Sequence, residues 1–531
     1  MKEKTLIWYK QFLTDKYLFY ITVISIIFSG LFIAYSFMDY NLVNMSAWDM
    51  GVYTQALSSG ITGHLFYSNL IPGSYLSEHF SPFLFILIIP YYFAPSGYTL
   101  LFLQDAAIGM STVILFLVAR EIFKRTKFNG KYINKNSLPF IISFAYLLSP
   151  LTESPVFFDF HLMVFLPLFF FLAIYFYLKQ KYLLNIIFLA MIVSLHSSFI
   201  FIVLMTVIME LFLNNTLKIK NVSYKKYSLL LGITFIVLAA YYMVAGLLKG
   251  EISGSLSIVP HIHVTGSVSP ISLPVYIITK PLYVFNLLSS YYYLKLIILF
   301  FAFGAFAFLF LRYPPAIFTF IPYLLYSMFS TYQSYYTIGY QYTMMIIPMA
   351  AFAAVMGLYM MDKNRHKIKS YNKKITVAVV AIIIVGIAGF SIASPVVYAY
   401  NPNNTISSEI LEYSNSSAMA KINFEHEISK NIGKDALVVT ENGLFSLFAN
   451  DPNATAFPFT SSVIIHGYYY TYLVDDENSN WSKENASIND KCYSLNDLET
   501  KYTNSGLYGV YADNYGIIVL KKGYTGPVNF N

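Results

Sequence analysis

Ten apolar stretches of about membrane-spanning length constrain the fold of this chain more than any other feature. A helix needs about 20 apolar residues to cross the hydrocarbon core of a bilayer. The composition agrees, because 57% of the residues are hydrophobic and only 11% are charged. The sequence therefore predicts an α-helical polytopic membrane protein and excludes soluble enzymes and nucleic-acid-binding proteins. The stretches are residues 17–36, 98–119, 137–150, 163–178, 182–213, 228–248, 292–311, 315–330, 342–361 and 375–394.

Basic residues gather in five segments between these stretches, where the positive-inside rule predicts cytoplasmic loops. Consecutive cytoplasmic loops must be separated by an even number of crossings. Segment 182–213 lies between two basic loops, so we expect a hairpin of two short spans that turns near His196 and Ser197. The basic segments are Lys2–Lys16, Arg120–Lys135, Lys179–Lys181, Lys218–Lys226 and Lys363–Lys374.

The same parity rule applies to the short apolar segment 81–95, which contains three prolines. Only two crossings are allowed between Lys16 and Arg120, and the first two apolar stretches supply both. We therefore expect segment 81–95 to be re-entrant or interfacial within an exterior loop, 37–97. The chain then makes about eleven crossings, with a cytoplasmic N-terminus and an exterior C-terminal tail.

The chain changes character at Pro395, so the sequence predicts a transmembrane domain, 1–395, and an exterior domain, 396–531. The first part contains 26 Lys and Arg against 12 Asp and Glu, and the second contains 8 against 15. We expect the tail to form a small α/β domain. Its predicted elements are a helix near Ile422–Ile432, strands at Ala436–Thr440 and Tyr472–Asp475, and a hairpin of Leu507–Tyr511 with Gly516–Leu520 around Asp513 and Asn514.

Ionisable residues of the membrane domain collect on its exterior face, which suits acid–base or metal chemistry there. Asp49 is the leading candidate, because it begins an amphipathic helix that includes Trp48, Tyr53 and Gln55. A carboxylate in the first turn of a helix suits either an N-cap or a general base. Both roles remain open for Asp49.

Other exterior residues suit the binding of an anionic lipid headgroup or a metal ion. Asp159 and His161 share a face if their backbone is extended. Together with His79 they could hold a divalent metal, although the spacing also fits polar caps at helix ends. Lys249 is one of the few basic residues on this side and could face a phosphate. The candidate binding residues are Glu78, His79, Asp159, His161, His196 and Lys249.

Four motifs carry a resemblance to a known family: Trp48-Asp49-Met50-Gly51-Val52-Tyr53-Thr54-Gln55, Ser77-Glu78-His79-Phe80-Ser81-Pro82, Phe158-Asp159-Phe160-His161 and Gln341-Tyr342-Thr343. They resemble a family of prokaryotic polytopic membrane proteins that is itself similar to the GT-C glycosyltransferases. The resemblance implies a GT-C-like fold, a sugar donor carried on a polyprenyl phosphate, and Asp49 as the acid that activates the acceptor. It also implies that Gln55 and Tyr342 contribute to substrate binding. It breaks at Leu195-His196-Ser197, where relatives often carry Lys-Glu-Asp.

An exterior active site restricts the donor, because nucleotide sugars are charged and cytoplasmic. We therefore expect a membrane glycosyltransferase that moves a sugar from a lipid-linked donor to a glycan or protein acceptor, with no nucleic-acid partner. A non-catalytic exterior binding or assembly protein is one alternative, and a secondary transporter is another. Transporters usually carry their ionisable groups near the midplane of two related halves, and this sequence shows neither feature.

The predicted membrane topology can be tested with a membrane-impermeant thiol reagent on intact cells. Native Cys492 should react from outside, whereas Asn364→Cys in a Cys492→Ser background should react only after permeabilisation, because it lies among basic residues. Reaction of Cys492 only after permeabilisation would reverse the whole topology.

Overall fold

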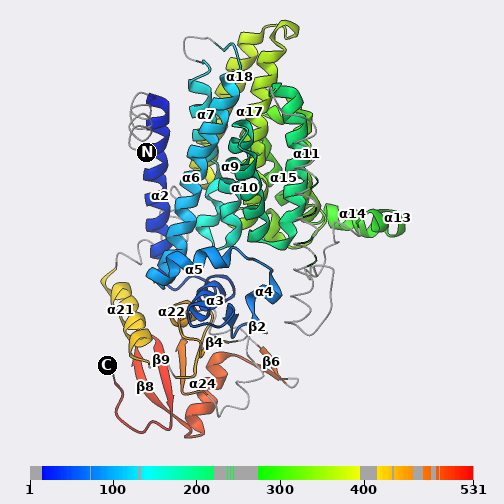
Figure 1. Ribbon diagram of the computed structural model, residues 1–531. Coiled ribbons are helices and arrows are strands. Elements are labelled where there is room, and N and C mark those ends of the chain that lie inside the picture. Colours follow the sequence, from blue (N-terminus) through cyan, green and yellow to red (C-terminus); the bar gives the residue numbers. More distant parts are fainter. Residues whose placement is uncertain are drawn as a thin grey trace. The chain divides into compact units, whose positions relative to one another are not determined.

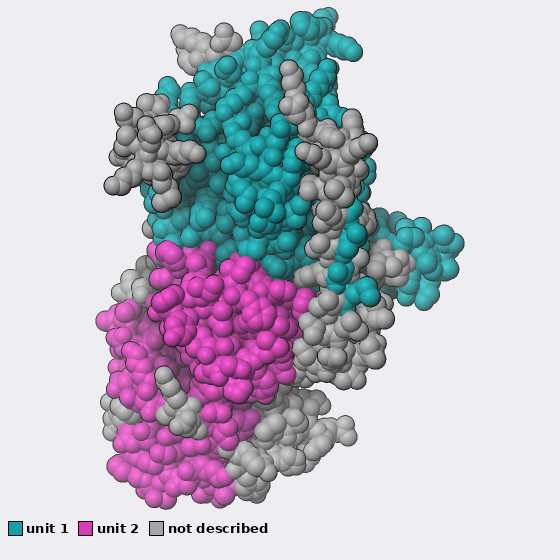
Figure 2. All heavy atoms as spheres, viewed as in Figure 1, with its two compact units in different colours: residues 1–33, 104–247, 257–398 teal, residues 34–103, 248–256, 399–531 magenta. Residues whose placement is uncertain are grey.

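The contacts in the computed structural model divide the chain into two compact units (Figure 2). Unit 1 comprises residues 1–33, 104–247 and 257–398, and unit 2 comprises residues 34–103, 248–256 and 399–531. The exterior loop that the sequence assigned to the membrane domain thus groups with the tail. The structure describes residues 15–71, 73–128, 133–219, 232, 236, 240, 243, 273–394, 415–432, 436–457, 470–479, 486–488 and 491–529.

Most helices of unit 1 run beside one another as a bundle, and α13 and α14 project from its side (Figure 1). Its α-helices are α7 (Ser137–Leu147), α8 (Pro150–Glu153), α9 (Leu166–Leu178), α10 (Tyr182–Leu195), α11 (Ile200–Leu217), α13 (Leu273–Thr279), α14 (Pro281–Ser289), α15 (Tyr292–Leu299), α16 (Ile317–Ser327), α17 (Ile347–Lys363) and α18 (Tyr371–Ala393). Short 3-10 or π segments connect them: η2 (Ser154–Phe157), η3 (Leu162–Phe165), η4 (Ser197–Phe199), η5 (Phe300–Gly304), η6 (Leu309–Arg312), η7 (Pro314–Ala316), η8 (Gln333–Tyr336), η9 (Gln341–Met345) and η10 (Arg365–Lys367). Helices α2 (Lys16–Asn41) and α6 (Gly97–Phe123) extend across the boundary of the two units.

Five helices among the described residues are long and apolar enough to cross a membrane, or seven if each of two bent helix pairs is one span. The predicted class, a helical polytopic membrane protein with a mixed α/β tail, is confirmed. The described helices that are long and apolar enough to span are therefore fewer than the roughly eleven crossings that the sequence predicts. Helices α9 and α10 have only 13 and 14 residues, and most of segment 228–248 lies outside the described residues.

Two local predictions agree with the helix bounds. Helix α10 ends at Leu195 and α11 begins at Ile200, so the chain breaks at His196 and Ser197 as expected. Segment 81–95 contains only α5 (Leu84–Phe93), a helix of 10 residues. At 1.5 Å per residue it is about 15 Å long, roughly half the thickness of a hydrocarbon core, so it cannot cross alone.

Helix α17 is the centre of unit 1, because every residue from Ile347 to Tyr359 is buried. Gly357 lets another segment approach closely, since a Cβ at this position would lie 2.2 Å from the carbonyl oxygen of Leu309. Helices α2 and α18 instead expose large apolar side chains such as Ile26 (66%) and Ile384 (59%). Such exposure is expected of helices that face lipid.

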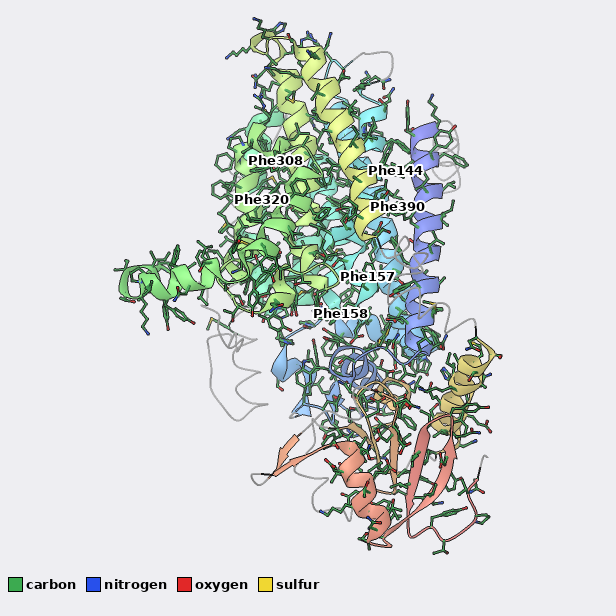
Figure 3. All side chains as sticks on the ribbon, turned by 180° about the vertical axis from the view of Figure 1, so that it is seen from behind. Phe144, Phe157, Phe158, Phe308, Phe320 and Phe390 are labelled. Carbon is green, nitrogen blue, oxygen red and sulfur yellow. The ribbon has the colours of Figure 1, made fainter. Side chains whose placement is uncertain are left out.

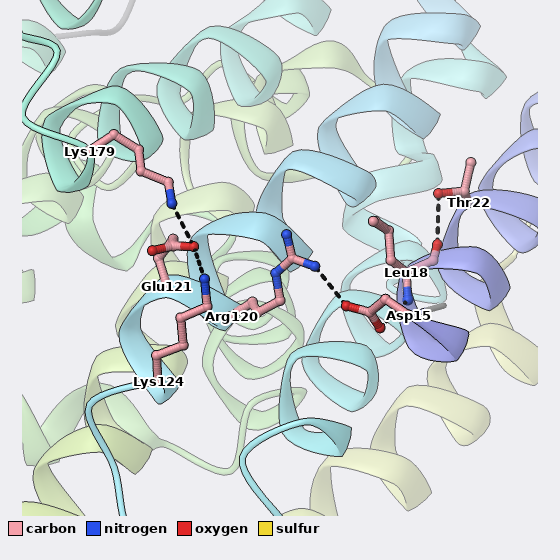
Figure 4. Close-up of polar contacts among 7 residues, drawn as sticks. All are labelled: Asp15, Leu18, Thr22, Arg120, Glu121, Lys124 and Lys179. Carbon is pink, nitrogen blue, oxygen red and sulfur yellow. Dashed lines mark hydrogen bonds and ion pairs between the residues drawn. The ribbon is translucent and has the colours of Figure 1, made fainter. Parts of the chain in front are cut away.

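The basic segments meet at one end of unit 1, as the parity rule requires. Figure 4 shows Arg120 paired with Asp15 at 2.7 Å and Lys179 paired with Glu121 at 2.8 Å. Lys363 donates a hydrogen bond to the carbonyl oxygen of Thr216, directly before the fourth basic segment. All five segments therefore have residues at, or next to, a common end of the bundle.

The tail forms a five-stranded mixed sheet with the strand order β4-β3-β5-β9-β8. Strands β4 and β5 are parallel to β3, whereas β9 is antiparallel to both β5 and β8. Helix α24 covers part of the sheet by packing Leu495, Leu498 and Tyr502 on it. The elements are α21 (Ser416–Asn431), β3 (Val438–Thr440), α22 (Phe445–Phe448), β4 (Ala454–Ala456), β5 (Tyr472–Asp476), β6 (Ala486–Ile488), β7 (Lys491–Tyr493), α24 (Leu495–Asn504), β8 (Tyr508–Asn514) and β9 (Ile517–Lys522).

The closing hairpin forms as predicted, but its turn lies two residues later. Asp513 and Asn514 belong to β8, and the turn is made by Tyr515 (φ 54°) and Gly516 (φ 81°). Two consecutive positive φ angles fit the right-handed twist of a hairpin. A register shift between Val510 and Ala512 adds a residue to β8, which the alternation of side chains did not reveal.

In unit 2 the loop that the sequence predicts to be exterior, 37–97, is joined to the tail by hydrogen bonds between residues nearly 400 positions apart. The loop contains η1 (Ala47–Gly51), α3 (Val52–Ile61), β1 (Tyr67–Ser68), β2 (Gly73–Ser74), α4 (Tyr75–Glu78) and α5. The Gln55 side chain donates to the carbonyl oxygens of Asp451 (3.0 Å) and Ala454 (2.9 Å). The Ser58 hydroxyl donates to the carbonyl oxygen of Asn450. We call this contact the loop–tail clasp, and it makes the loop and the sheet one folded body.

The packing of the clasp can be tested at Gly51, where a Cβ would lie 2.4 Å from Cδ1 of buried Phe445. We expect Gly51→Ala to lower the free energy of unfolding by roughly 1–3 kcal/mol, because the ring must move. The measurement is thermal unfolding of the full chain in detergent, with Phe445→Leu as a partial rescue. Gly30→Ala is the control, since no atom lies within 4 Å of a Cβ there. Equal effects of Gly30→Ala and Gly51→Ala would contradict the contact.

Candidate functional site

Asp49 lies in η1, a single π-helical turn whose N-cap is another residue. Ser46 has an extended backbone, and its hydroxyl oxygen accepts a hydrogen bond from the Trp48 amide at 3.0 Å. The amide of Gly51 reaches the Ser46 carbonyl oxygen at 3.2 Å, which makes the turn wider than an α-helical one. The cap is therefore supplied by Ser46, and the carboxylate of Asp49 is available for another role.

The carboxyl group of Asp49 is held in a partly buried position on this turn. Among the residues described in unit 2, none donates a hydrogen bond to it. Burial disfavours the charged form and raises the pKa of Asp49 to about 7. A carboxyl group with this pKa exchanges protons at neutral pH, which is the property required of a general base.

The tail fixes the turn that carries Asp49. Asn442 is buried, and its side-chain carbonyl oxygen accepts the Ala47 amide at 2.8 Å. Glu441 shapes the segment around Asn442, because its carboxylate accepts the backbone amides of Gly443 (2.9 Å) and Leu444 (2.7 Å). Asn442 is thus the residue through which the tail positions the first turn of the exterior loop.

Gln55 is committed to the loop–tail clasp. Its two donor positions bind Asp451 and Ala454, and its carbonyl oxygen accepts from the Ser68 hydroxyl (2.9 Å) and the Asn69 amide (2.8 Å). All the hydrogen-bonding positions of this side chain are therefore occupied within unit 2. A substrate that used Gln55 would have to replace one of these bonds.

Glu78 and His79 lie at the end of the four-residue helix α4. Glu78 is its last residue, and His79 follows as an extended C-cap. The imidazole ring of His79 lies 5.8 Å from the ring of Tyr75, centroid to centroid. Both residues belong to the same folded loop as Asp49, although α4 and η1 are separate elements.

In unit 1, Asp159 and His161 are buried, and His161 contacts Gln104 of α6. The backbone amide of His161 donates to the side-chain oxygen of Gln104 at 2.9 Å, and its Nδ1 accepts the Met163 amide at 3.2 Å. His161 therefore caps η3. The backbone at His161 is extended, as the Asp-x-His prediction required.

Tyr342 lies in η9, which packs against η2 and η3. Ser154 joins η2 to this region, because its hydroxyl donates to the Tyr340 carbonyl oxygen (2.8 Å) and accepts the Gly339 amide (2.8 Å). Phe158, labelled in Figure 3, adds a ring contact of 5.0 Å with Tyr340. The structure thus brings the elements that carry Asp159, His161 and Tyr342 into contact.

The remaining candidates are not assembled with this group. The Nδ1 atom of His196 lies 2.6 Å from the Ser198 hydroxyl and caps η4. Lys249 lies outside the described residues. Within the described ranges, no three His, Cys, Asp or Glu side chains are arranged to hold a metal ion, so Asp159, His161 and His79 alone do not form a ligand set.

The sequence missed Asn442 and Ser46 in unit 2 and gave no role to Gln104 in unit 1. Asn and Ser are common in loops, and neither carries a charge that would single it out. Asp49 and Asn442 lie far apart in the chain, so only the folded contact reveals their connection. Gln104 could have been noticed as an amide inside an apolar helix.

Comparison with known proteins identifies one family. Residues 40–519 match the model of a family described as predicted membrane protein, DUF2079. This match agrees with the resemblance to a family of polytopic membrane proteins. No curated protein matches the sequence.

Among solved structures, the chain is similar to ArnT from Cupriavidus metallidurans bound to undecaprenyl phosphate. The identity is 10%, the TM-score is 0.49, and the alignment covers 93% of this chain and 97% of that one. A likeness at this level carries no argument about activity or ligand.

Two buried carboxyl groups in the tail predict an unusual pH dependence of stability. Burial is the main cause that raises the pKa values of Glu425 and Glu441 to about 8. In the unfolded chain the pKa of a glutamate is about 4.3. Between this pH and about pH 8 the folded chain therefore binds more protons than the unfolded chain. The free energy of unfolding should therefore fall as the pH rises from about 5 to about 8.

We expect the melting temperature of the full chain to fall by several degrees over this pH range. Glu425→Gln should weaken that dependence, because an amide cannot titrate. Glu427→Gln on the exposed side of the same helix serves as the control. An unchanged pH profile in Glu425→Gln would exclude Glu425 as a source of the effect.

Proposed function

The chain belongs to the DUF2079 family of predicted membrane proteins, and we propose that it is a membrane glycosyltransferase with an exterior active site. Its donor is a sugar linked to a polyprenyl phosphate, and its acceptor is a glycan or protein hydroxyl group. The multi-pass membrane part holds the prenyl chain. The N-terminus and the basic end of unit 1 are cytoplasmic, and the tail is exterior.

The proposed reaction is a displacement at the anomeric carbon of the donor sugar. Asp49 accepts the proton of the acceptor hydroxyl as its oxygen bonds to that carbon. The bond between the anomeric carbon and the phosphate oxygen breaks, and the electron pair leaves with the polyprenyl phosphate. The negative charge of this leaving group requires a nearby cation or hydrogen-bond donor.

One observation carries the proposal: Asp49 has a pKa near 7 on a turn that is capped and positioned by other residues. Ser46 already caps this turn, so the carboxylate of Asp49 is not needed as a cap. Precise placement of a base is expensive in conformational entropy, and the loop–tail clasp supplies the rigid support for it. The resemblance of the 48–55 motif to GT-C-type loops gives Asp49 the same role.

We assign phosphate-binding roles to the polar residues that the sequence motifs single out. Asp159 and His161 are buried directly before η3, which packs against η9. His79, in the first loop, is a separate candidate.

A secondary transporter is the second candidate, and one observation favours it. Two helix pairs in unit 1 are broken, with bends of 54° and 64°. Broken helices are common at the substrate sites of transporters. The two functions differ in their products, since only the transferase forms a new glycosidic bond and releases a polyprenyl phosphate.

The Asp49 hypothesis is tested by Asp49→Asn, which preserves size but removes the proton acceptor. Transfer from a polyprenyl-phosphate sugar should fall by roughly 10²- to 10⁴-fold, while donor binding changes little. The measurements are single-turnover transfer and donor binding by purified protein in lipid. Near-normal transfer by a folded Asp49→Asn protein would remove Asp49 from the mechanism.

Companion variants separate positioning from phosphate binding. Asn442→Ala should lower transfer through misplacement of η1 and leave donor binding near normal, whereas Asn442→Asp keeps the acceptor oxygen and should retain more transfer. His79→Ala and Asp159→Asn should weaken donor binding instead. If both of these leave donor binding unaltered, the phosphate assignment is wrong.

A further inference from the structure

The first bent helix pair contains a buried acid that the proposed reaction does not use. Helix α7 ends at Leu147, and α8 with η2 resumes at Pro150 after a bend of 54°. Ser149 is the N-cap of α8, yet its side chain makes no capping hydrogen bond. Glu153 is the last residue of α8, and its exposed fraction is 0%.

Three buried side chains near this bend have unused oxygen atoms. Neither carboxylate oxygen of Glu153 has a hydrogen-bond partner among the described residues, and the same holds for the hydroxyl groups of Ser149 and Ser394. Ser149 and Glu153 are four positions apart, so they share one face of the helix. The Ser394 side chain lies beside the Glu153 carboxyl without reaching hydrogen-bond geometry.

Helix α18 is held against the bend by close backbone packing. A Cβ at Gly389 would lie 3.3 Å from Cδ of Pro150, and one at Gly386 would lie 3.8 Å from Ala145. The end of α18 is therefore fixed next to α8, and Ser394 follows that end directly. The oxygen atoms of Glu153, Ser149 and Ser394 come from two elements that are firmly packed together.

The elements packed against α8 provide no cation to pair with Glu153. These elements are α7, α18, η2, η5 and η9. Their titratable groups are Tyr146 on α7, Tyr342 on η9, and Tyr371, Lys373 and Lys374 at the far end of α18. Lys374 precedes Ser394 by a helix length of about 30 Å. A buried carboxylate without a partner is costly, so a cation from outside the chain must compensate it.

We infer that Ser149, Glu153 and Ser394 form an intramembrane site for a small monovalent cation, Na⁺ or the proton. Carboxylate and hydroxyl oxygens are the ligands that hard cations prefer. Ionisable residues inside membrane proteins commonly mark ion or proton sites, and broken helices supply many of them. The inference is independent of the glycosyltransferase proposal, because it requires neither Asp49 nor a sugar.

The site can be probed with dicyclohexylcarbodiimide, an apolar reagent that reacts with protonated carboxyl groups. The carboxyl proton moves to a carbodiimide nitrogen, the carboxylate oxygen bonds to the central carbon, and rearrangement gives a stable N-acylurea without a leaving group. The full-length protein in lipid is treated from about pH 6 to about pH 9 in NaCl or choline chloride. Mass spectrometry then quantifies the adduct on the peptide that contains Glu153.

We expect Glu153 to be modified, with the modification declining as the pH rises. Suppression by NaCl but not by choline chloride identifies Na⁺ as the occupant, and pH dependence without suppression identifies the proton. Glu210 is a matched comparison within the same protein, because it is equally buried but accepts the Asn185 amide at 2.8 Å. Its labelling should not respond to Na⁺. Absence of labelling at Glu153, or labelling insensitive to both pH and Na⁺, would overturn the inference.

Thermal unfolding gives a second measurement that does not depend on the reagent. If Na⁺ is the occupant, NaCl should raise the melting temperature of the wild-type protein above its value in choline chloride, and Glu153→Gln should abolish the difference. Ser394→Ala retains the carboxyl group and removes one ligand, so it serves if Glu153→Gln fails to fold. If Na⁺ is the occupant, Ser394→Ala should weaken the suppression of labelling by Na⁺. If the proton is the occupant, Ser394→Ala should shift the pH at which labelling declines. A full wild-type response in both variants would exclude the site.

Discussion

The hydrocarbon core of a membrane contains no water, so backbone groups at that depth must find their partners within the protein. This constraint explains how unit 1 tolerates so many short, irregular segments. Where the chain leaves helical geometry, polar side chains take over: Ser154 binds both Gly339 and Tyr340, Thr343 donates to the Leu151 carbonyl oxygen, and Gln104 accepts the His161 amide. These bonds hold η2 and η3 against η9, which packs on the buried helix α17. The candidate residues Asp159, His161 and Tyr342 lie where the irregular backbone is concentrated.

The second unit is organised by a different interaction, the loop–tail clasp. The two longest helices of the first loop, α3 and α5, have only 10 residues each. The tail supplies backbone carbonyl oxygens for Gln55 and Ser58 and a side-chain oxygen for the Ala47 amide. Asp49 therefore acquires a defined position from residues that take no part in the proposed proton transfer.

Hydropathy and charge were sufficient to predict the features that depend on local sequence. The break at His196, the short helix in segment 81–95, and the strands at Val438–Thr440 and Tyr472–Asp476 follow from apolar length, parity and alternation. Contacts between distant residues leave no such periodic signal. The pairing of the loop with the tail, the role of Asn442 and the burial of Glu153 therefore emerged only from the fold. The hairpin turn was misplaced because Asp and Asn favour turns, while a bulge in β8 shifted the register.

The loop–tail clasp can form only after the tail has been synthesised. Ala47 and Asn442 are 395 positions apart. At a synthesis rate of roughly 5–20 residues per second, the loop emerges about 20–80 s before its partner exists. During that interval the Asp49 segment lacks the contacts that fix its turn. In the proposed exterior topology the tail must also be exported before the contact can form. A nascent or truncated chain is thus expected to hold its catalytic candidate in an unformed state until the whole polypeptide has been made and translocated.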